Sequence, residues 1–176
     1  MIVRLSELLR LSLENVGTQE VPLRKELDFL ERYLEIEKIR FESRLSVEFD
    51  IDPGVLDARV PNLLLQPLVE NAIRHGIGNS AEGGMVSIVA RRAGTRLELE
   101  VTDTGAATMN PMLPVRKGVG IANTQARLER LYGSAHQFVL RQGTRGGIEC
   151  RITMPLLSQE PGIDKPSLPA PVHAHG

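Results

Sequence analysis

Hydrophobic residues recur along the chain at two spacings, which divide it into helices and strands. Leucines three or four residues apart predict a helix over residues 2–16 and a longer amphipathic helix that starts near Pro22. A third helix is predicted over about residues 60–76, and a fourth over residues 121–133. Hydrophobic residues at alternate positions predict five strands, in the stretches LSVEFDID, MVSIVARR, RLELEVTD, HQFVLRQ and GIECRITMP.

The same spacings predict which side chains face the core. The long helix should bury Leu23, Leu27, Leu30, Leu34 and Ile39. The first strand should bury every second residue from Leu45 to Ile51, including Val47 and Phe49, and the last should bury Ile148, Cys150, Ile152 and Met154.

The order of these elements predicts an α+β fold, a two-layer α/β sandwich that follows a helical segment. Its helices would cover one face of a largely antiparallel sheet. We expect a helical segment over residues 1–42 and the sandwich over residues 43–156. Residues 157–176 are Pro-rich and lack an apolar pattern, which predicts a disordered tail.

Composition and charge narrow the classes of protein. Hydrophobic residues make up 41% of the chain and aromatic residues only 3%, so the core must consist of Leu, Ile and Val. The 21 basic and 22 acidic residues argue against nucleic-acid binding, which favours a basic face. Cys150 is the only cysteine, which excludes an intrachain disulfide. No apolar run is long enough to span a membrane, so we expect a cytoplasmic segment without membrane contact.

The stretch LLLQPLVENAIRHGI, residues 63–77, carries polar groups that a core-filling helix does not need. Helical spacing places Pro67, Asn71, Arg74 and His75 on one face, beside an apolar stripe of Leu64, Leu68 and Ala72. An asparagine oxygen suits Mg²⁺, and arginine and histidine can bind phosphate. Pro67 should disturb the helix interior. The alternative is a kinked surface helix whose polar residues have no shared role, and this segment alone does not decide between the two.

Two further segments carry candidate binding groups. Asp103 ends a strand and could accept a hydrogen bond from an exocyclic amine such as that of adenine, while Gly105 permits a turn; an ordinary Asp-x-Gly turn is the alternative. Gly118 and Gly120 open a helix whose first N–H groups could face an anion, although they could also simply begin a helix. Arg116 and Lys117 add positive charge there, and the chain contains no P-loop motif.

In this order the three segments resemble the N, G1 and G2 boxes of the Bergerat-type ATP-binding fold, which gyrase, MutL and histidine kinases share. LQPLVENAIRHG together with VPLRKELDFLERYLEIEKIRF is similar to LytS-like sensor histidine kinases, and the resemblance runs from about Val3 to Pro155.

The resemblance implies a site for ATP and Mg²⁺. Asn71 would bind the metal, and Glu70 beside it would orient the nucleophile or the water shell of the metal. Asp103 would bind adenine, with room provided by Gly105, and residues 106–117 would form a lid. The nucleotide site would also include Arg74, His75, Lys117, Gly118, Gly120 and Ile121.

Two positions depart from the family pattern. Ala107 replaces the second glycine of the D-x-G-x-G loop, which puts the flexibility of the lid in doubt. The pair Gly147–Ile148 replaces Gly-Thr, so a hydroxyl group near adenine should be missing.

The activity implied is that of an ATP-dependent protein-histidine kinase in a two-component phosphorelay. The γ-phosphoryl group would pass to a histidine and then to a response regulator. No P-H-F-L-F-N-like acceptor motif is present, so we expect the acceptor upstream of this chain; His173 and His175 should be solvated rather than metal-binding. The family also implies a homodimer formed through the upstream helices and a full-length protein anchored in the bacterial inner membrane.

Two alternatives stay open. The first is a non-catalytic nucleotide-binding module that regulates a partner, which would explain Ala107, Ile148 and the missing acceptor. Against this interpretation, the expected binding residues are all present: Asn71, Asp103, Gly118 and Gly120. An ATPase such as a chaperone or topoisomerase subunit would need further domains.

Overall fold

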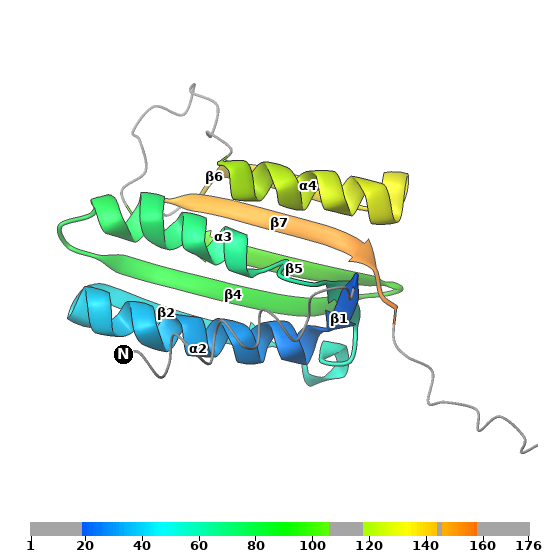
Figure 1. The fold of residues 1–176 in the computed structure, drawn as a ribbon, viewed down its shortest axis with the longest axis horizontal. Coiled ribbons are helices and arrows are strands. Elements are labelled where there is room, and N and C mark those ends of the chain that lie inside the picture. Colours follow the sequence, from blue (N-terminus) through cyan, green and yellow to red (C-terminus); the bar gives the residue numbers. More distant parts are fainter. Residues whose placement is uncertain (1–18, 106–117, 144–145, 158–176) are drawn as a thin grey trace, which may run out of the picture.

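The computed structural model describes residues 19–105, 118–143 and 146–157, and within them helices cover a five-stranded sheet (Figure 1). Strands run in the order β2-β4-β5-β7-β6, and only the β2–β4 pair is parallel. Helices α2, α3 and α4 lie on one face of this sheet. This arrangement confirms the predicted α+β sandwich. The bounds of the strands are β2 (Leu45–Ile51), β4 (Gly84–Ala93), β5 (Arg96–Asp103), β6 (Gln137–Gln142) and β7 (Ile148–Pro155).

Helix α2 (Leu23–Phe41) begins directly after Pro22, as its sequence predicts. Just before it, β1 (Glu20–Pro22) pairs antiparallel with β3 (Arg59–Pro61). These three-residue strands are too short to produce an alternating pattern, so the hydrophobic spacing does not predict them. The predicted core residues of α2 are buried with one exception, because Ile39 is 52% exposed. Ile39 lies about 140° around the helix from Leu34, whereas Phe41, two turns after Leu34, continues the buried stripe.

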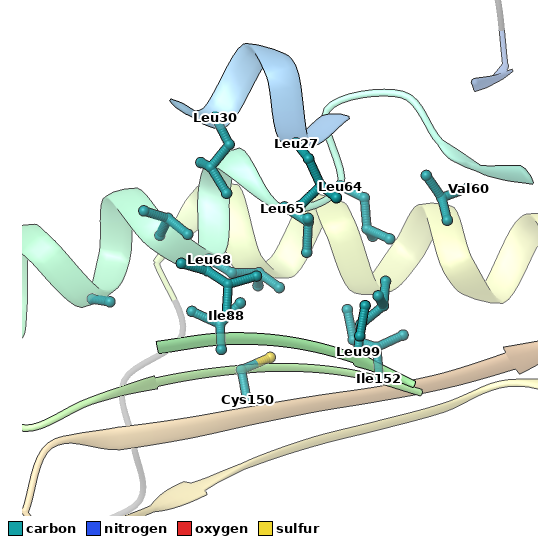
Figure 2. Packing of buried hydrophobic residues seen from close by; sticks show 14 of the residues in the cluster. Leu27, Leu30, Val60, Leu64, Leu65, Leu68, Ile88, Leu99, Cys150 and Ile152 are labelled. Atoms are coloured by element: carbon teal, nitrogen blue, oxygen red, sulfur yellow. The ribbon is translucent and has the colours of Figure 1, made fainter. Parts of the chain in front are cut away.

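Helix α2 belongs to the same core as the sheet. Figure 2 shows Leu27 and Leu30 of α2 pointing toward Leu65 and Leu68, above strands that carry Ile88 and other buried residues. One cluster of buried residues joins α2, β1, the sheet and the other two helices. The boundary predicted between residues 42 and 43 therefore falls inside a packed unit, which begins at β1 within the described part of the chain.

The third helix starts later than predicted. Residues 59–61 form β3, and α3 (Gln66–Asn71) begins only at Gln66, followed by a π-helical turn over Ala72–Gly76. Pro67 consequently lies in the first turn, where its missing N–H group costs no helical hydrogen bond, so the predicted disturbance of a helix interior is wrong. The predicted core stripe is confirmed, since Leu64, Leu68 and Ala72 are all buried.

Buried Glu26 of α2 fixes the start of α3. Its carboxylate accepts hydrogen bonds from the N–H groups of Leu63, Leu64 and Leu65, at 2.6, 2.7 and 3.2 Å. Burial raises the pKa of Glu26, although these three bonds oppose the shift. Leu63 has a φ of 56°, and its carbonyl accepts a hydrogen bond from Arg127 of α4 at 3.1 Å. Three helices are thus joined at the residues that precede α3.

The remaining elements agree closely with the predicted ones. Gly94, with a φ of 62°, forms the turn between β4 and β5. Helix α4 (Val119–Tyr132) ends at Gly133. In β7 the predicted burial of Cys150, Ile152 and Met154 is confirmed, whereas Ile148 is only half-buried. Strand β2 lies at the edge of the sheet, where Phe49 stays 37% exposed. Short 3₁₀ turns occur at Glu42–Arg44, Pro53–Val55, Ile77–Asn79 and Gly133–Ala135.

Several predicted features lie outside the described residues. These are the helix over residues 2–16, the lid over residues 106–117 with Lys117, and the tail from residue 158. Within the described ranges, no helix is both long enough and apolar enough to cross a membrane.

Candidate functional site

Two cavities meet between the helices and the sheet, and they share the side chains of Asn71 and Ile121. The smaller, about 10 Å³, lies against the sheet and has room for no more than about one water molecule. The larger, about 750 Å³, lies among the end of α2, the end of α3 and the start of α4. These helix ends gather at the same side of the molecule, at the left in Figure 1.

Asp103 provides the hydrogen-bonding group of the small cavity. It ends β5, is only 3% exposed, and is held by two backbone bonds. The N–H groups of Gly105 and Ile148 donate to its Oδ1 and Oδ2, both at 3.0 Å. Burial raises the pKa of the Asp103 carboxyl, and the two amide bonds act against that shift. Each carboxylate oxygen keeps a lone pair for another donor. The other lining side chains are mainly apolar: Leu68, Ala72, Val101, Ile121, Leu140, Ile148 and Cys150.

Three glycines enclose the Asp103 carboxylate. A Cβ atom on Gly105 would lie 2.1 Å from the carbonyl carbon of Gly76, and one on Gly76 would lie 2.2 Å from Asp103 Oδ1. A Cβ atom on Gly147 would lie 2.0 Å from the carbonyl oxygen of Asp103. A larger residue at Gly105 or Gly147 would displace backbone atoms around the carboxylate, and one at Gly76 would displace the carboxylate itself.

Gly105 was predicted to leave room at Asp103, while the roles of Gly76 and Gly147 were missed. The only signal was their position, one directly after His75 and the other in a Gly-Gly pair before the last strand. At Ile148 the backbone N–H group binds Asp103, and the side chain adds apolar surface to the small cavity.

The larger cavity is formed where α4 approaches α3. A Cβ atom on Gly118 would lie 3.9 Å from Asn71 Oδ1, and one on Gly120 would lie 3.3 Å from Cβ of Pro67. The first intrahelical bond of α4 runs from Ala122 N–H to the Gly118 carbonyl, at 3.1 Å. Among the residues that the structure describes, no side chain caps the helix at Gly118. The N–H groups of the first turn, which lines the cavity, are therefore available to an anion.

Glu70, Arg74 and His75 also line the larger cavity, together with Asn71. The spacing argument correctly placed Pro67, Asn71, Arg74 and His75 on one side of the helix. Glu70 is exposed, and its Oε1 accepts a hydrogen bond from Gln66 Nε2 at 2.6 Å. Of the predicted site residues that the structure describes, all line one of these cavities except Gly105, which instead binds Asp103.

One wall of the larger cavity, which the sequence pattern did not predict, is formed by the end of α2 and the 3₁₀ turn after it. Tyr33 lines this wall together with Glu37; burial raises the pKa of Tyr33, and nearby Glu37 and Glu70 add to the shift. The signal was a second stripe at helical spacing, on the side of α2 next to its leucines. Its members on α2 are Tyr33, Glu37, Arg40 and Phe41, and Arg44 in the 3₁₀ turn after the helix completes the wall.

The donor set suits a metal that keeps most of its water ligands. Within the described residues, no three His, Cys, Asp or Glu side chains gather to hold a metal ion. Asn71 Oδ1 instead offers a single neutral oxygen next to Gly118 at the start of α4. Mg²⁺ commonly binds proteins through one or two oxygen ligands and takes the others from water and phosphate. The residues present therefore fit Mg²⁺ bound together with a phosphate chain.

Comparison with solved structures shows the fold of a histidine kinase. The histidine kinase domain of the Erythrobacter litoralis EL346 blue-light activated kinase matches with a TM-score of 0.60 at 19% identity. The match covers 88% of this chain and 74% of that domain. Histidine kinase ThkA, solved in complex with response regulator protein TrrA, matches with a TM-score of 0.58 at 17% identity, over 89% of this chain and 48% of that chain.

Sequence comparison narrows the family. Residues 1–45 match the family described as Histidine kinase. Sensor protein LytS of Oceanobacillus iheyensis is 33% identical over 159 residues, and sensor histidine kinase YpdA of Escherichia coli is 36% identical over 153 residues. These alignments cover 84% and 82% of this chain. The chain therefore belongs to the LytS-like sensor histidine kinases, and it spans 27% of the length of each of these two relatives.

Proposed function

We propose that this chain is the ATP-binding catalytic portion of a two-component sensor histidine kinase. It binds ATP with Mg²⁺ and presents the γ-phosphoryl group to a histidine, from which a response regulator receives it. The proposal rests on the membership of the family and on the arrangement of Asp103, Asn71 and the start of α4 along two cavities that share lining residues.

The observation that carries the proposal is the environment of Asp103. A buried carboxylate whose two oxygens are oriented by backbone N–H groups, in an otherwise apolar pocket, suits a flat apolar ring that bears one amine donor. Adenine has this chemistry. The pocket is too narrow for a purine as it stands, so binding must move side chains apart. Leu140 and Ile148 are only half-buried and have the most freedom to do so.

The path from base to phosphate follows the residues that the cavities share. With the base at Asp103, the phosphate chain passes Asn71 and enters the larger cavity. Asn71 would hold Mg²⁺ on the chain, and the first-turn N–H groups of α4 would bind phosphate oxygens. Arg74 and His75 would add donors on the side of α3, and Glu70, which lines the same cavity, would orient an incoming nucleophile or the water shell of the metal. Catalysis would depend on positioning and on charge stabilisation, because phosphoryl transfer requires little covalent participation by the protein.

Within the described residues, no histidine is placed to accept the phosphoryl group. His75 lines the nucleotide cavity itself. His136 follows α4, whose other end borders the cavity, and 14 helical residues separate the two by about 20 Å. Its Nδ1 donates to the Gly133 carbonyl at 2.6 Å. We therefore propose that the acceptor lies on another segment of a full-length protein, which forms a homodimer anchored in the inner membrane with this portion in the cytoplasm.

The experiment is a calorimetric titration of the chain with ATP and GTP in the presence of Mg²⁺. ATP should bind and GTP should bind much more weakly, because guanine presents a carbonyl where adenine presents the amine. In the full-length protein, labelled ATP should yield acid-labile phosphohistidine that passes to a response regulator. Binding of ATP without transfer in the full-length protein would instead support a non-catalytic regulatory module.

A further inference from the structure

The wall formed by the end of α2 and the 3₁₀ turn after it carries two arginines with few partners among the described residues. Arg40 and Arg44 both lie over the ring of Phe41, with their guanidinium carbons 5.2 and 5.6 Å from its centroid. Phe41 is 7% exposed and belongs to the core, so its ring is a fixed platform. Two cations that share one ring repel each other unless an anion lies nearby.

The acidic groups nearby offset this charge only partly. Glu37 Oε2 lies 3.6 Å from Arg40 Nη1, beyond hydrogen-bonding distance, and the Arg40 side chain is 72% exposed. The same Glu37 oxygen is buried and has no hydrogen-bond partner among the described residues. Arg44 Nη1 reaches the Ser80 carbonyl only at 3.5 Å. These loose contacts leave the donors of both guanidinium groups available to a ligand in the cavity.

The position of this wall identifies the part of the ligand that it meets. Asp103 lines only the small cavity, Asn71 lines both, and Arg40 and Arg44 line only the larger one. A nucleotide whose base lies at Asp103 and whose phosphate chain passes Asn71 reaches the α2 wall with the end farthest from the base. A guanidinium group matches the oxygens of a terminal phosphate, which it can bind through two parallel hydrogen bonds.

We infer that Arg40 and Arg44 bind the terminal phosphoryl group of the nucleotide and so let the site distinguish ATP from ADP. The inference rests on the proposed nucleotide site and adds to it a second group of phosphate ligands, opposite the start of α4. The buried Glu37 carboxylate, 3.6 Å from Arg40, would orient its guanidinium group toward the cavity. Occupancy by ATP would then tie the end of α2 to α4, which ADP cannot do.

The test compares the affinities of a non-hydrolysable ATP analogue and of ADP, at fixed Mg²⁺, for the intact chain and for Arg40→Gln and Arg44→Gln. Each substitution should weaken binding of the ATP analogue roughly tenfold, the cost of one charge-assisted contact, and change ADP affinity by less than about twofold. The double variant should bind the two nucleotides with similar affinity. Because the lost contacts are exposed to solvent, the preference of the wild type for the ATP analogue should shrink as salt is raised.

Lys38→Gln is the matched control, because it removes one positive charge from the same last turn of α2 at an exposed position outside the cavity. It should leave both affinities unchanged. Arg40→Lys keeps the charge but not the fork, and should restore part of the preference for the ATP analogue. Thermal melts check that every variant is folded.

An equal loss for the ATP analogue and ADP in Arg40→Gln and Arg44→Gln, or no loss for either, would overturn the assignment of the terminal phosphate. A similar loss in Lys38→Gln would also overturn it, because the effect would then be general electrostatic attraction. If the wild-type chain bound neither nucleotide, the proposed function itself would fail, so the two failures are distinguishable.

Discussion

Asp103 and Arg40 both line the candidate nucleotide site, but they are held in different ways. Two backbone N–H groups and three glycines surround Asp103, whereas an aromatic ring and a carboxylate 3.6 Å away locate Arg40. The base side of the site is therefore part of the folded core, and the phosphate side is an exposed arrangement of long side chains. Changes on the base side should cost folding stability and binding together, while changes on the phosphate side should cost binding alone.

The largest effect is expected from Gly105→Ala. The new Cβ atom would lie 2.1 Å from a backbone carbon of Gly76, and backbone atoms cannot yield as a flexible side chain can. We expect the free energy of unfolding to fall by about 3 kcal/mol and ATP binding to be lost. Chemical denaturation and calorimetric titration measure the two effects.

Two control variants separate the site from general destabilisation. Gly94→Asn changes a glycine in the β4–β5 turn that has no atom within 4 Å of a new Cβ, and asparagine tolerates its positive φ. This substitution should leave the free energy of unfolding and ATP binding nearly unchanged. Leu64→Ala removes a fully buried side chain and should cost about 3 kcal/mol of stability, yet the folded fraction should still bind ATP. Full binding by folded Gly105→Ala would show that the close contact with Gly76 does not shape the base pocket.

Asp103→Ala should have the next largest effect. It leaves the N–H groups of Gly105 and Ile148 without their acceptor and removes the partner of the adenine amine. We expect a loss of about 2 kcal/mol in stability and a tenfold to hundredfold loss in ATP affinity. Asp103→Asn keeps the shape of the side chain but offers an acceptor to only one of the two backbone amides. Its stability should therefore lie between that of the wild type and that of Asp103→Ala. Asp28→Asn, at an exposed site on α2, is the control. Unchanged affinity in Asp103→Ala would remove this residue from the base pocket.

The contrast between the two sides also explains what the sequence could predict. Asp103, Asn71, Gly118 and Gly120 lie in short segments whose order carries a family pattern, and helical spacing was enough to place Asn71 beside Arg74 and His75. The antiparallel strands follow from alternation, because each buries one face.

Contacts between distant segments could not be predicted in this way. The bonds from the residues before α3 to Glu26 join positions 37 to 39 residues apart, and no local spacing encodes them. For the same reason the predicted start of α3 is six residues early, and the predicted boundary separates α2 from the sheet although its leucines belong to the same buried cluster. The polar stripe of α2 was visible in the sequence, but only the fold shows that it faces Asn71 across a cavity.

Asn71→Ala tests the junction of the two sides and should have a smaller effect than the changes at Asp103. Its oxygen is proposed as a ligand of Mg²⁺, so ATP affinity should fall about tenfold with Mg²⁺ present and by less than about twofold in a chelator. The melting temperature without nucleotide should change little, because Asn71 is only half-buried. Asn123→Ala, exposed on α4 outside both cavities, is the matched control. Full stabilisation of the variant by Mg·ATP would contradict the ligand assignment.

The smallest expected effect is a pH dependence that has opposite signs for folding and for binding. Burial raises the pKa of Asp103 above its ordinary value near 3.8, so the folded chain holds this proton more tightly than the unfolded chain. Its contribution to stability is therefore fully present below pH 3.8 and is lost as pH rises through the higher folded pKa. The ionised carboxylate accepts a hydrogen bond from adenine more strongly than the neutral acid, so ATP affinity should rise over the same interval.

The control is the variant Asp103→Asn. The pKa of Glu26 is also raised, but Glu26 is present in both the wild type and the variant, so the difference between their stability curves isolates Asp103. We expect this difference to slope through that interval and to be flat above it, and the rise in affinity to be absent in the variant. A difference that is flat at all pH values would mean that Asp103 titrates as it does in the unfolded chain. Burial on the base side of the site would then have no electrostatic effect on this carboxyl group.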